Sequence, residues 1–328
     1  MPQSSPRSNQ RQQNPAPKPT PRSTQRPNQT EAAEVVDPAW LVKAISLVVL
    51  AALICGYLTL CLLFSQGQWQ LVLHPVRTTS APQTIVGAPY QLVRFGTDET
   101  GMPQLTGWWI PAEPSGRYAQ TTILFLPGAD GSLADTIPTL AGLHNLGINV
   151  FAFDYRGYGQ SAATHPSQQR MTHDAESALQ YLTTTRSIPP QQIVPYGTGA
   201  GASLATHLAA SHPEISALVL DTPQTDLLDA VLRDRRTRLL PVRLLFHERF
   251  PLAEPLSTLR TPKLLLSRTS TQPEAFRTAS TPKLTVEFAN TSESLFNQSI
   301  IRFLDQYLPR APEPLLVPPT APSATTPH

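Results

Sequence analysis

The distribution of hydrophobic and polar positions divides the chain into four parts. Residues 1–39 are rich in Pro, Gln and Ser, residues 310–328 are rich in Pro, and neither segment shows apolar periodicity. Such segments bury too little apolar surface to offset the entropy of ordering, so we expect both tails to be disordered. Residues 40–66 are dominated by a continuous apolar run, and residues 70–309 alternate between short apolar runs and helical patterns. The pattern therefore predicts one transmembrane helix followed by one folded domain.

The apolar run at residues 44–64 contains no charged side chain. At about 1.5 Å per residue it is long enough to cross a hydrocarbon core of about 30 Å, so we expect it to contact membrane lipid along its length. A cleaved signal peptide has a short basic start, whereas a long polar region precedes this run, which favours a retained signal anchor. Basic residues before the run, such as Arg26 and Lys43, favour a cytoplasmic N-terminus and a periplasmic or extracellular domain.

The apolar runs of the domain have the length and spacing of strands that are buried on both faces. They lie at residues 121–126, 149–154, 192–196, 215–220, 263–267 and 283–288. Helical patterns separate most of them, at residues 133–146, 167–184, 200–210, 226–240 and 292–308. Two earlier runs, at residues 90–95 and 105–111, predict an antiparallel hairpin at the start of the domain. The alternation predicts an α/β fold, a mostly parallel sheet with helices on both faces.

Composition narrows the classes of partner. The net charge of +2 is small, so nothing in the composition indicates a nucleic-acid partner. Both cysteines, Cys55 and Cys61, lie inside the apolar run, so we expect neither a disulfide nor a cysteine-based metal site in the domain. No cofactor motif is found, and we expect neither a cofactor nor a metal.

Three turns that follow predicted strands carry a resemblance to a known family. Residues 126–132 read LPGADGS, residues 154–161 read DYRGYGQS and residues 193–205 read IVPYGTGAGASLA. They resemble, in that order, the oxyanion turn, the turn after the next strand and the nucleophile elbow of α/β-hydrolases. Residues 71–308 as a whole resemble the membrane-anchored Bem46-like and serine aminopeptidase-like subfamily. The resemblance implies an α/β-hydrolase-like fold whose site lies at the carboxyl ends of the parallel strands.

The elbow of this family has the pattern Gly-x-Ser-x-Gly, because the serine must project from a tight turn between a strand and a helix. The five corresponding positions here are Gly197, Thr198, Gly199, Ala200 and Gly201. Glycine therefore stands at the nucleophile position. The resemblance places the catalytic acid at Ser270 or Thr271, and it places the histidine in residues 289–294, which read ANTSES. The serine, the acid and the histidine are all replaced in this alignment.

Three residues are weak substitutes for this triad. Ser203 belongs to a second, loose Gly-x-Ser match, but it lies about one helical turn beyond the nucleophile position. His207 follows Ser203 by four residues, a spacing that places both on one face of a helix. Asp221 lies at the end of a predicted strand, where some proteins of this fold have their catalytic acid. In the family that the chain resembles, the residue at this position is commonly a structural carboxylate. The backbone N–H groups of Ala129 and Ala200 are the expected oxyanion-type donors, available to a carbonyl or an anion.

Three replacements at three turns favour a domain that lacks the chemistry of its family. The preferred interpretation is a membrane-anchored pseudoenzyme, a binding or scaffolding module for a small ligand or a protein partner. The alternative is an active hydrolase of esters, amides or peptides with non-standard residues, so enzymatic activity stays an open question. A further alternative makes the sequence PAPKPTPR at residues 15–22 a polyproline-type ligand, although a solvated spacer is the simpler interpretation.

Overall fold

The computed structural model describes residues 37–78, 82, 84–85, 87, 89–224, 227–268, 273–287 and 293–308. Most of both predicted tails lies outside these residues, as do Ser270, Thr271 and residues 289–292 in the predicted acid and histidine turns. The chain divides into two compact units, Met1–Cys55 and Gly56–His328, and each is described by itself.

The N-terminal helix α1 runs from Pro38 to Gly67, slightly beyond the predicted residues 40–66 at both ends. Asp37 begins it, because its carboxylate accepts a hydrogen bond from the backbone N–H of Ala39 at 2.9 Å. Proline at the first helical position suits the start of a helix, where its missing N–H has no partner to lose. Together with the 3₁₀ turn η1 (Gln68–Leu71), this helix is long and apolar enough to cross a membrane.

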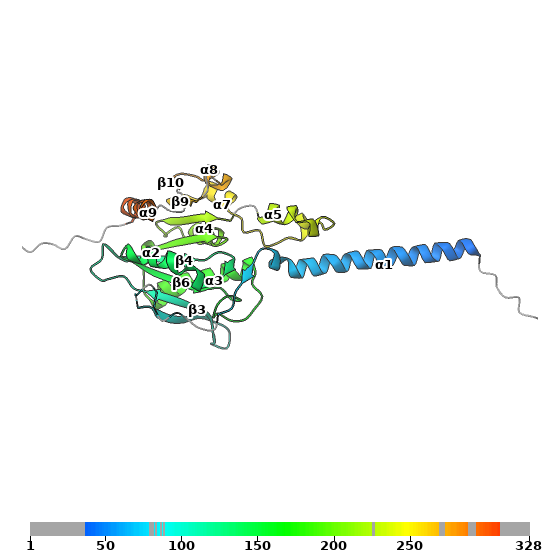
Figure 1. The fold of residues 1–328 in the computed structure, drawn as a ribbon, viewed down its shortest axis with the longest axis horizontal. Helices are drawn as coiled ribbons and strands as arrows, with labels where there is room; N and C mark the ends of the chain where they lie inside the picture. Colours follow the sequence, from blue (N-terminus) through cyan, green and yellow to red (C-terminus); the bar gives the residue numbers. More distant parts are fainter. Residues whose placement is uncertain are drawn as a thin grey trace, which may run out of the picture. The chain divides into compact units, whose positions relative to one another are not determined.

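The second unit is built on an eight-stranded sheet with the order β10-β9-β8-β7-β4-β6-β3-β2 (Figure 1). Six neighbouring strands run parallel: β4 (Tyr118–Leu126), β6 (Ile148–Asp154), β7 (Ile193–Gly199), β8 (Leu218–Pro223), β9 (Lys263–Ser267) and β10 (Lys283–Glu287). The strands β2 (Gln91–Thr97) and β3 (Pro103–Ile110) form the predicted antiparallel hairpin, and β3 also pairs antiparallel with β6. The predicted mostly parallel sheet is confirmed.

A second, two-stranded pair lies outside this sheet. The strand β1 (His74–Pro75) pairs in parallel with β5 (Asp130–Gly131), which belongs to the turn after β4. The chain that follows α1 is thereby held to the carboxyl-terminal edge of the sheet, where the predicted site lies.

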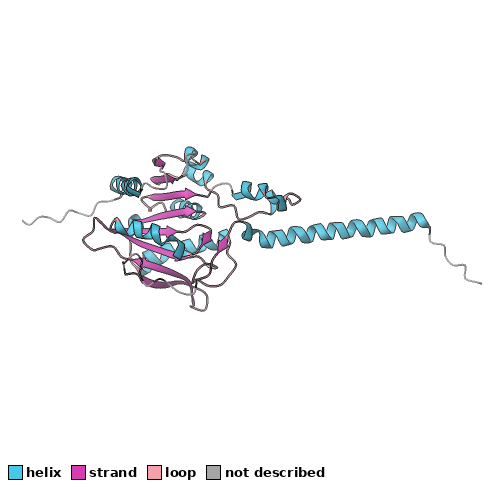
Figure 2. Ribbon diagram, viewed as in Figure 1, coloured by secondary structure: helices cyan, strands magenta, loops and turns pink. Residues whose placement is uncertain are grey.

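Helices cover both faces of the large sheet (Figure 2), and each face has its own apolar cluster. Residues of α3 (Gln168–Gln180) and α4 (Gly201–Ser211) belong to one cluster, and residues of α2 (Ile137–Asn145) and α9 (Glu293–Tyr307) belong to the other. Successive residues of β6 from Val150 to Phe153 alternate between the two clusters. This alternation is expected of a strand that is buried on both faces.

The predicted helix at residues 226–240 is wrong as a single element. The helix α5 (Leu227–Arg233) ends before Asp234, whose carboxylate caps the 3₁₀ turn η5 (Arg235–Thr237) by accepting from the N–H of Arg236. A further short helix, α6 (Val242–Leu245), begins after Pro241. Aspartate and proline favour helix starts over helix interiors, and here they divide the segment. We call residues 227–252, which lie between β8 and α7, the cap.

The remaining helical elements are short. They are η2 (Leu133–Thr136), the π turn η3 (Tyr181–Thr185) that extends α3, η4 (Pro190–Gln192), α7 (Ala253–Thr258) and α8 (Glu274–Thr278). The predicted helix at residues 133–146 thus begins as a 3₁₀ turn, and the predicted helix at residues 167–184 ends as a π turn.

Candidate functional site

The turn between β7 and α4 has the geometry of a nucleophile elbow. The strand β7 lies between β4 and β8 and ends at Gly199, and α4 begins two residues later at Gly201. The φ angle of Gly199 is +52°, a left-handed conformation that residues with a side chain rarely adopt. Gly199 therefore occupies the apex of a sharp strand-to-helix turn, the position from which a catalytic side chain of this type projects.

The glycines on either side of this apex are required by close packing. A Cβ atom on Gly197 would overlap the backbone of Gly201 and Ala202, and a Cβ atom on Gly201 would overlap the carbonyl oxygen of Leu126. By contrast, a Cβ atom on Gly199 would meet only the Cα atom of Gly128, at an ordinary contact distance of 3.4 Å. Space for a side chain thus exists at Gly199, and its positive φ is the only local obstacle to one.

The turn after β4 lies against the elbow through the contact between Gly128 and Gly199. The neighbours of these glycines, Ala129 and Ala200, are 2% and 0% exposed. Within the described part of the chain, neither of their backbone N–H groups donates a hydrogen bond to another residue. Buried N–H groups without a protein acceptor are available to a carbonyl or anionic oxygen.

The turn after β6, which carries the sequence DYRGYG, is braced by two carboxylates. Asp154 accepts hydrogen bonds from the backbone N–H of Leu133 at 2.8 Å and of Gln160 at 3.4 Å. Burial raises the pKa of the Asp154 carboxyl, and these hydrogen bonds partly oppose the rise. Arg156 donates from its backbone N–H and from Nε to Asp174, at 2.8 and 2.6 Å. Arg156 thus ties this turn to the Asp174 carboxylate in α3.

The structure does not unite the weak substitutes Ser203 and His207. Ser203 lies in α4 and is 6% exposed, and its hydroxyl donates to the carbonyl oxygen of Pro251 in the cap at 2.7 Å. His207 is exposed, and its Nε2 atom lies 3.9 Å from a carboxylate oxygen of Glu176. The Ser203 hydroxyl thus bonds to a backbone carbonyl of the cap, and His207 is not its hydrogen-bond partner in the described part of the chain.

Asp221, the alternative acid, lies in β8 and is 3% exposed. Its carboxylate accepts from the hydroxyl of Tyr196 at 2.8 Å and from the hydroxyl of Thr222 at 2.8 Å. It also forms an ion pair with Arg268, 3.1 Å from the guanidinium. Burial together with the nearby Asp221 carboxylate raises the pKa of Tyr196 well above its ordinary value. Sequence reasoning missed Arg268, for which the only signal was a basic residue directly after a buried strand.

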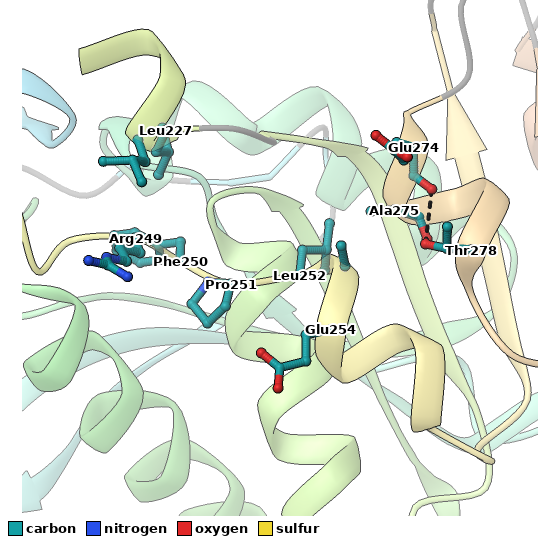
Figure 3. Close-up of a pocket in the computed structure, with 11 residues that line it drawn as sticks. Leu227, Arg249, Phe250, Pro251, Leu252, Glu254, Glu274, Ala275 and Thr278 are labelled. Atoms are coloured by element: carbon teal, nitrogen blue, oxygen red, sulfur yellow. Dashed lines mark hydrogen bonds between the residues drawn. The ribbon is translucent and has the colours of Figure 1, made fainter. Parts of the chain in front are cut away.

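A cavity of about 360 Å³ lies beside the cap (Figure 3). Its walls come from α5, from the end of the cap and from the turns around α7 and α8, and they include Leu227, Phe250, Leu252, Glu274 and Thr278. The hydroxyl of Thr278 donates to the carbonyl oxygen of Glu274 at 3.1 Å. Neither the elbow nor the oxyanion-type turn contributes to these walls. The cavity is therefore separate from the site that the sequence predicts.

Comparison with known proteins shows similarity over the second unit. Residues 118–309 match the family model of the serine aminopeptidases, S33 (Hydrolase_4). The uncharacterized protein Rv2307c of Mycobacterium tuberculosis is 32% identical over 164 residues, which cover 50% of this chain and 56% of that protein. The α/β hydrolase domain-containing protein WAV2 of Arabidopsis thaliana is 34% identical over 128 residues, 38% of this chain and 41% of that protein. The chain thus spans about half the length of the curated relatives it matches.

Among solved structures, the esterase Pf2001 of Pyrococcus furiosus superposes with a TM-score of 0.57 at 18% sequence identity, over 73% of this chain and 99% of that chain. At this identity the likeness shows the fold alone, and the fold is that of the α/β-hydrolases. The match to the family model extends over more than half of the chain and includes the elbow, the cap and the last helix. On these grounds the chain belongs to the serine aminopeptidase S33 family of α/β-hydrolase-fold proteins.

Proposed function

We propose that this chain is a membrane-anchored, Bem46-like member of its family that binds a ligand at the elbow without covalent catalysis. The observation that carries the proposal is Gly199. It occupies the apex of the elbow with φ = +52° and leaves the nucleophile position without a side chain, although the surroundings have space for one. A retained elbow that lacks its reactive group favours binding or scaffolding over turnover.

The surroundings of the substitute residues support this proposal. The Ser203 hydroxyl is engaged by the Pro251 carbonyl, and the Asp221 carboxylate is engaged by Tyr196 and Arg268. The sequence contains no histidine between His247 and His328, so none lies in the turn after the last strand of the sheet. A serine hydroxyl without a general base is a weak nucleophile near neutral pH.

The two turns at the elbow favour a ligand with a carbonyl or carboxylate group. The buried N–H groups of Ala129 and Ala200 are donors without a protein acceptor among the described residues. Donors held by a rigid strand-to-helix turn bind such an oxygen without any reorganisation of the backbone. The absence of a side chain at Gly199 leaves room for the ligand to approach the turn directly.

Ester turnover tests the proposal directly. The purified full-length protein is incubated with p-nitrophenyl esters of short and medium acyl chains, beside a known esterase and the Gly199→Ala variant. We expect release of p-nitrophenol at the background rate for both forms of this protein. Turnover above background that is abolished by Ser203→Ala would instead support the alternative, an active hydrolase with non-standard residues.

Binding is measured separately from turnover. Octanoate, the carboxylate product of a medium-chain ester, should raise the Tm of the full-length protein relative to chloride at the same ionic strength. The Gly199→Val variant, in which a side chain occupies the space beside Gly128, should show a smaller rise. An equal rise in both forms would place the carboxylate elsewhere on the protein and would contradict a ligand site at the elbow.

A further inference from the structure

The cap has an inner face that belongs to the core and an outer face that carries exposed leucines. On the inner face Leu227, Val231, Val242 and Phe246 are at most 3% exposed and contribute to the apolar cluster beside α3 and α4. On the outer face Leu239 and Leu244 are 78% and 76% exposed. A folded element that holds large apolar side chains in solvent is typical of an interaction surface.

The outer face is also strongly basic. The arginines at positions 233, 235, 236, 238 and 243 are all exposed, and none of them forms an ion pair with a residue that the structure describes. The acidic residues of the same segment are Asp229, Asp234 and the buried Glu248. Arginine binds phosphate through two parallel hydrogen bonds, so this face fits a partner with anionic phosphate groups.

The cap is fixed to the end of the apolar helix, within the unit Gly56–His328. Gln68, the first residue after α1, is 6% exposed and accepts a hydrogen bond from the backbone N–H of His247 at 2.7 Å. Its Nε2 atom lies 3.4 Å from Nδ1 of the same histidine. Leu244 precedes His247 by three residues, a stretch that spans at most about 11 Å. Leu244 is therefore held close to the point at which the chain leaves the apolar helix.

We propose that the cap docks onto the bilayer surface, where Leu239 and Leu244 enter the boundary between headgroups and acyl chains and the arginines bind anionic phospholipid headgroups. The proposal rests on the membrane anchoring proposed above. A protein partner with anionic groups would also fit the arginines, but the hydrogen bond between Gln68 and His247 holds the neighbouring part of the cap, with Leu244, close to the end of a membrane-length helix. Arginine side chains reach the headgroups while neighbouring leucines enter the acyl boundary, so leucines and arginines that are exposed on the same element suit the membrane interface.

The test uses the full-length protein in vesicles of phosphatidylcholine alone and in vesicles that also contain phosphatidylglycerol. Hydrogen–deuterium exchange of the cap is followed by mass spectrometry. We expect exchange of the cap to be several-fold slower in the anionic vesicles, and high salt should remove the difference because it screens charges at the surface. Each basic side chain near an anionic surface strengthens the association roughly fivefold.

Matched variants separate the cap from the overall charge. The triple variant Arg235→Gln/Arg236→Gln/Arg238→Gln should lose the protection by anionic lipid. The control variant Arg94→Gln/Arg260→Gln/Arg302→Gln removes the same amount of charge from exposed positions outside the cap. This control should keep the protection by anionic lipid. If the first triple variant has a lowered Tm, the test uses Leu239→Ser/Leu244→Ser and the salt dependence of the unchanged protein in its place. The leucine variant should lose the protection by anionic lipid, and high salt should remove it from the unchanged protein.

The outcomes distinguish the two proposals. Failure of the protein to float with either kind of vesicle contradicts the anchoring. Flotation with equal exchange of the cap in both kinds of vesicle overturns the docking of the cap alone. Protection that persists in detergent without lipid and grows with protein concentration would assign this face to a second copy of the chain and would also overturn the proposal.

Discussion

At the scale of single residues, Gly199 combines a left-handed backbone with space for a side chain. Its neighbours Gly197 and Gly201 differ, because a Cβ atom there overlaps backbone atoms. In the family this conformation is held by a serine, whose backbone is then strained. Glycine adopts the conformation without that strain and carries no side chain.

Gly199→Ala should lower the free energy of unfolding by about 1 to 3 kcal/mol, because alanine restores the strain without adding chemistry. Urea denaturation of the full-length protein in detergent measures the change. Gly142→Ala is the matched control: Gly142 lies in α2, a methyl group added there would meet no atom within 4 Å, and the variant should gain up to about 1 kcal/mol from helix propensity. If Gly199→Ala stabilised the protein as Gly142→Ala does, the turn would not be an elbow.

Lys263 is a second residue whose surroundings make a prediction. It is 0% exposed, and its ammonium donates to the carbonyl oxygens of Leu259 at 2.8 Å and Ser280 at 3.0 Å. Burial, with a smaller contribution from the charge of Lys283, lowers the pKa of Lys263 from 10.5 to about 8. The folded state therefore releases this proton at a lower pH than the unfolded state does.

Because the unfolded state binds more protons between pH 8 and 10.5, the contribution of Lys263 to stability should rise with pH across this window. Lys263→Met removes the titration. The difference in unfolding free energy between the unchanged protein and Lys263→Met should shift in favour of the unchanged protein from about pH 8 to about pH 10. A difference that is flat over this window would show that the amine titrates normally.

At the scale of elements, the carboxyl ends of β8 and β9 are joined by the ion pair of Asp221 and Arg268. The side chain of Asp221 is 4% exposed and that of Arg268 is 37% exposed. Removal of one partner of a buried pair leaves an uncompensated charge, which costs more than the pair itself contributes. We therefore expect the pair to stabilise the junction between β8 and β9.

Arg268→Gln should destabilise the protein by about 2 to 4 kcal/mol, below the full cost of a fully buried pair because the guanidinium is partly exposed. The double variant Asp221→Asn/Arg268→Gln should recover part of this loss. Thermal unfolding of the two single variants and the double variant gives the coupling energy between the two side chains. Strict additivity would contradict a structural pair.

The strands and most helices could be predicted from the sequence because short apolar runs of strand length alternate with longer segments of helical periodicity. The helix at residues 226–240 could not, since its periodicity continues through Asp234 while the capping preference of that side chain ends α5. The ion pair between Asp221 and Arg268 could not be predicted from the sequence either, because it depends on the pairing of β8 with β9. The glycine at the elbow apex could be predicted, because residues 193–205 resemble the elbow of the family and align Gly199 with the serine of its Gly-x-Ser-x-Gly pattern.

At the scale of the whole molecule, an apolar helix of membrane length is combined with a domain of the serine aminopeptidase S33 family. The anchoring and the docking of the cap, both proposed above, are tested by separate experiments.

The full-length protein should remain in the membrane fraction after carbonate washing, because a helix as apolar as α1 does not leave a bilayer when peripheral contacts are broken. The domain should be digested by protease added outside spheroplasts. Release by carbonate contradicts the anchor. Protection of the domain in intact spheroplasts contradicts the orientation.

The most direct test of the central claim is reaction with a fluorophosphonate, which forms a covalent bond with activated serines. The full-length protein, Gly199→Ser and an active serine hydrolase are treated together and examined for label by gel and by peptide mapping. We expect only the active hydrolase to be labelled, because Gly199→Ser still lacks a histidine to accept the proton of the hydroxyl. Labelling of the unchanged protein that is lost on Ser203→Ala would contradict the claim that this elbow binds without covalent catalysis.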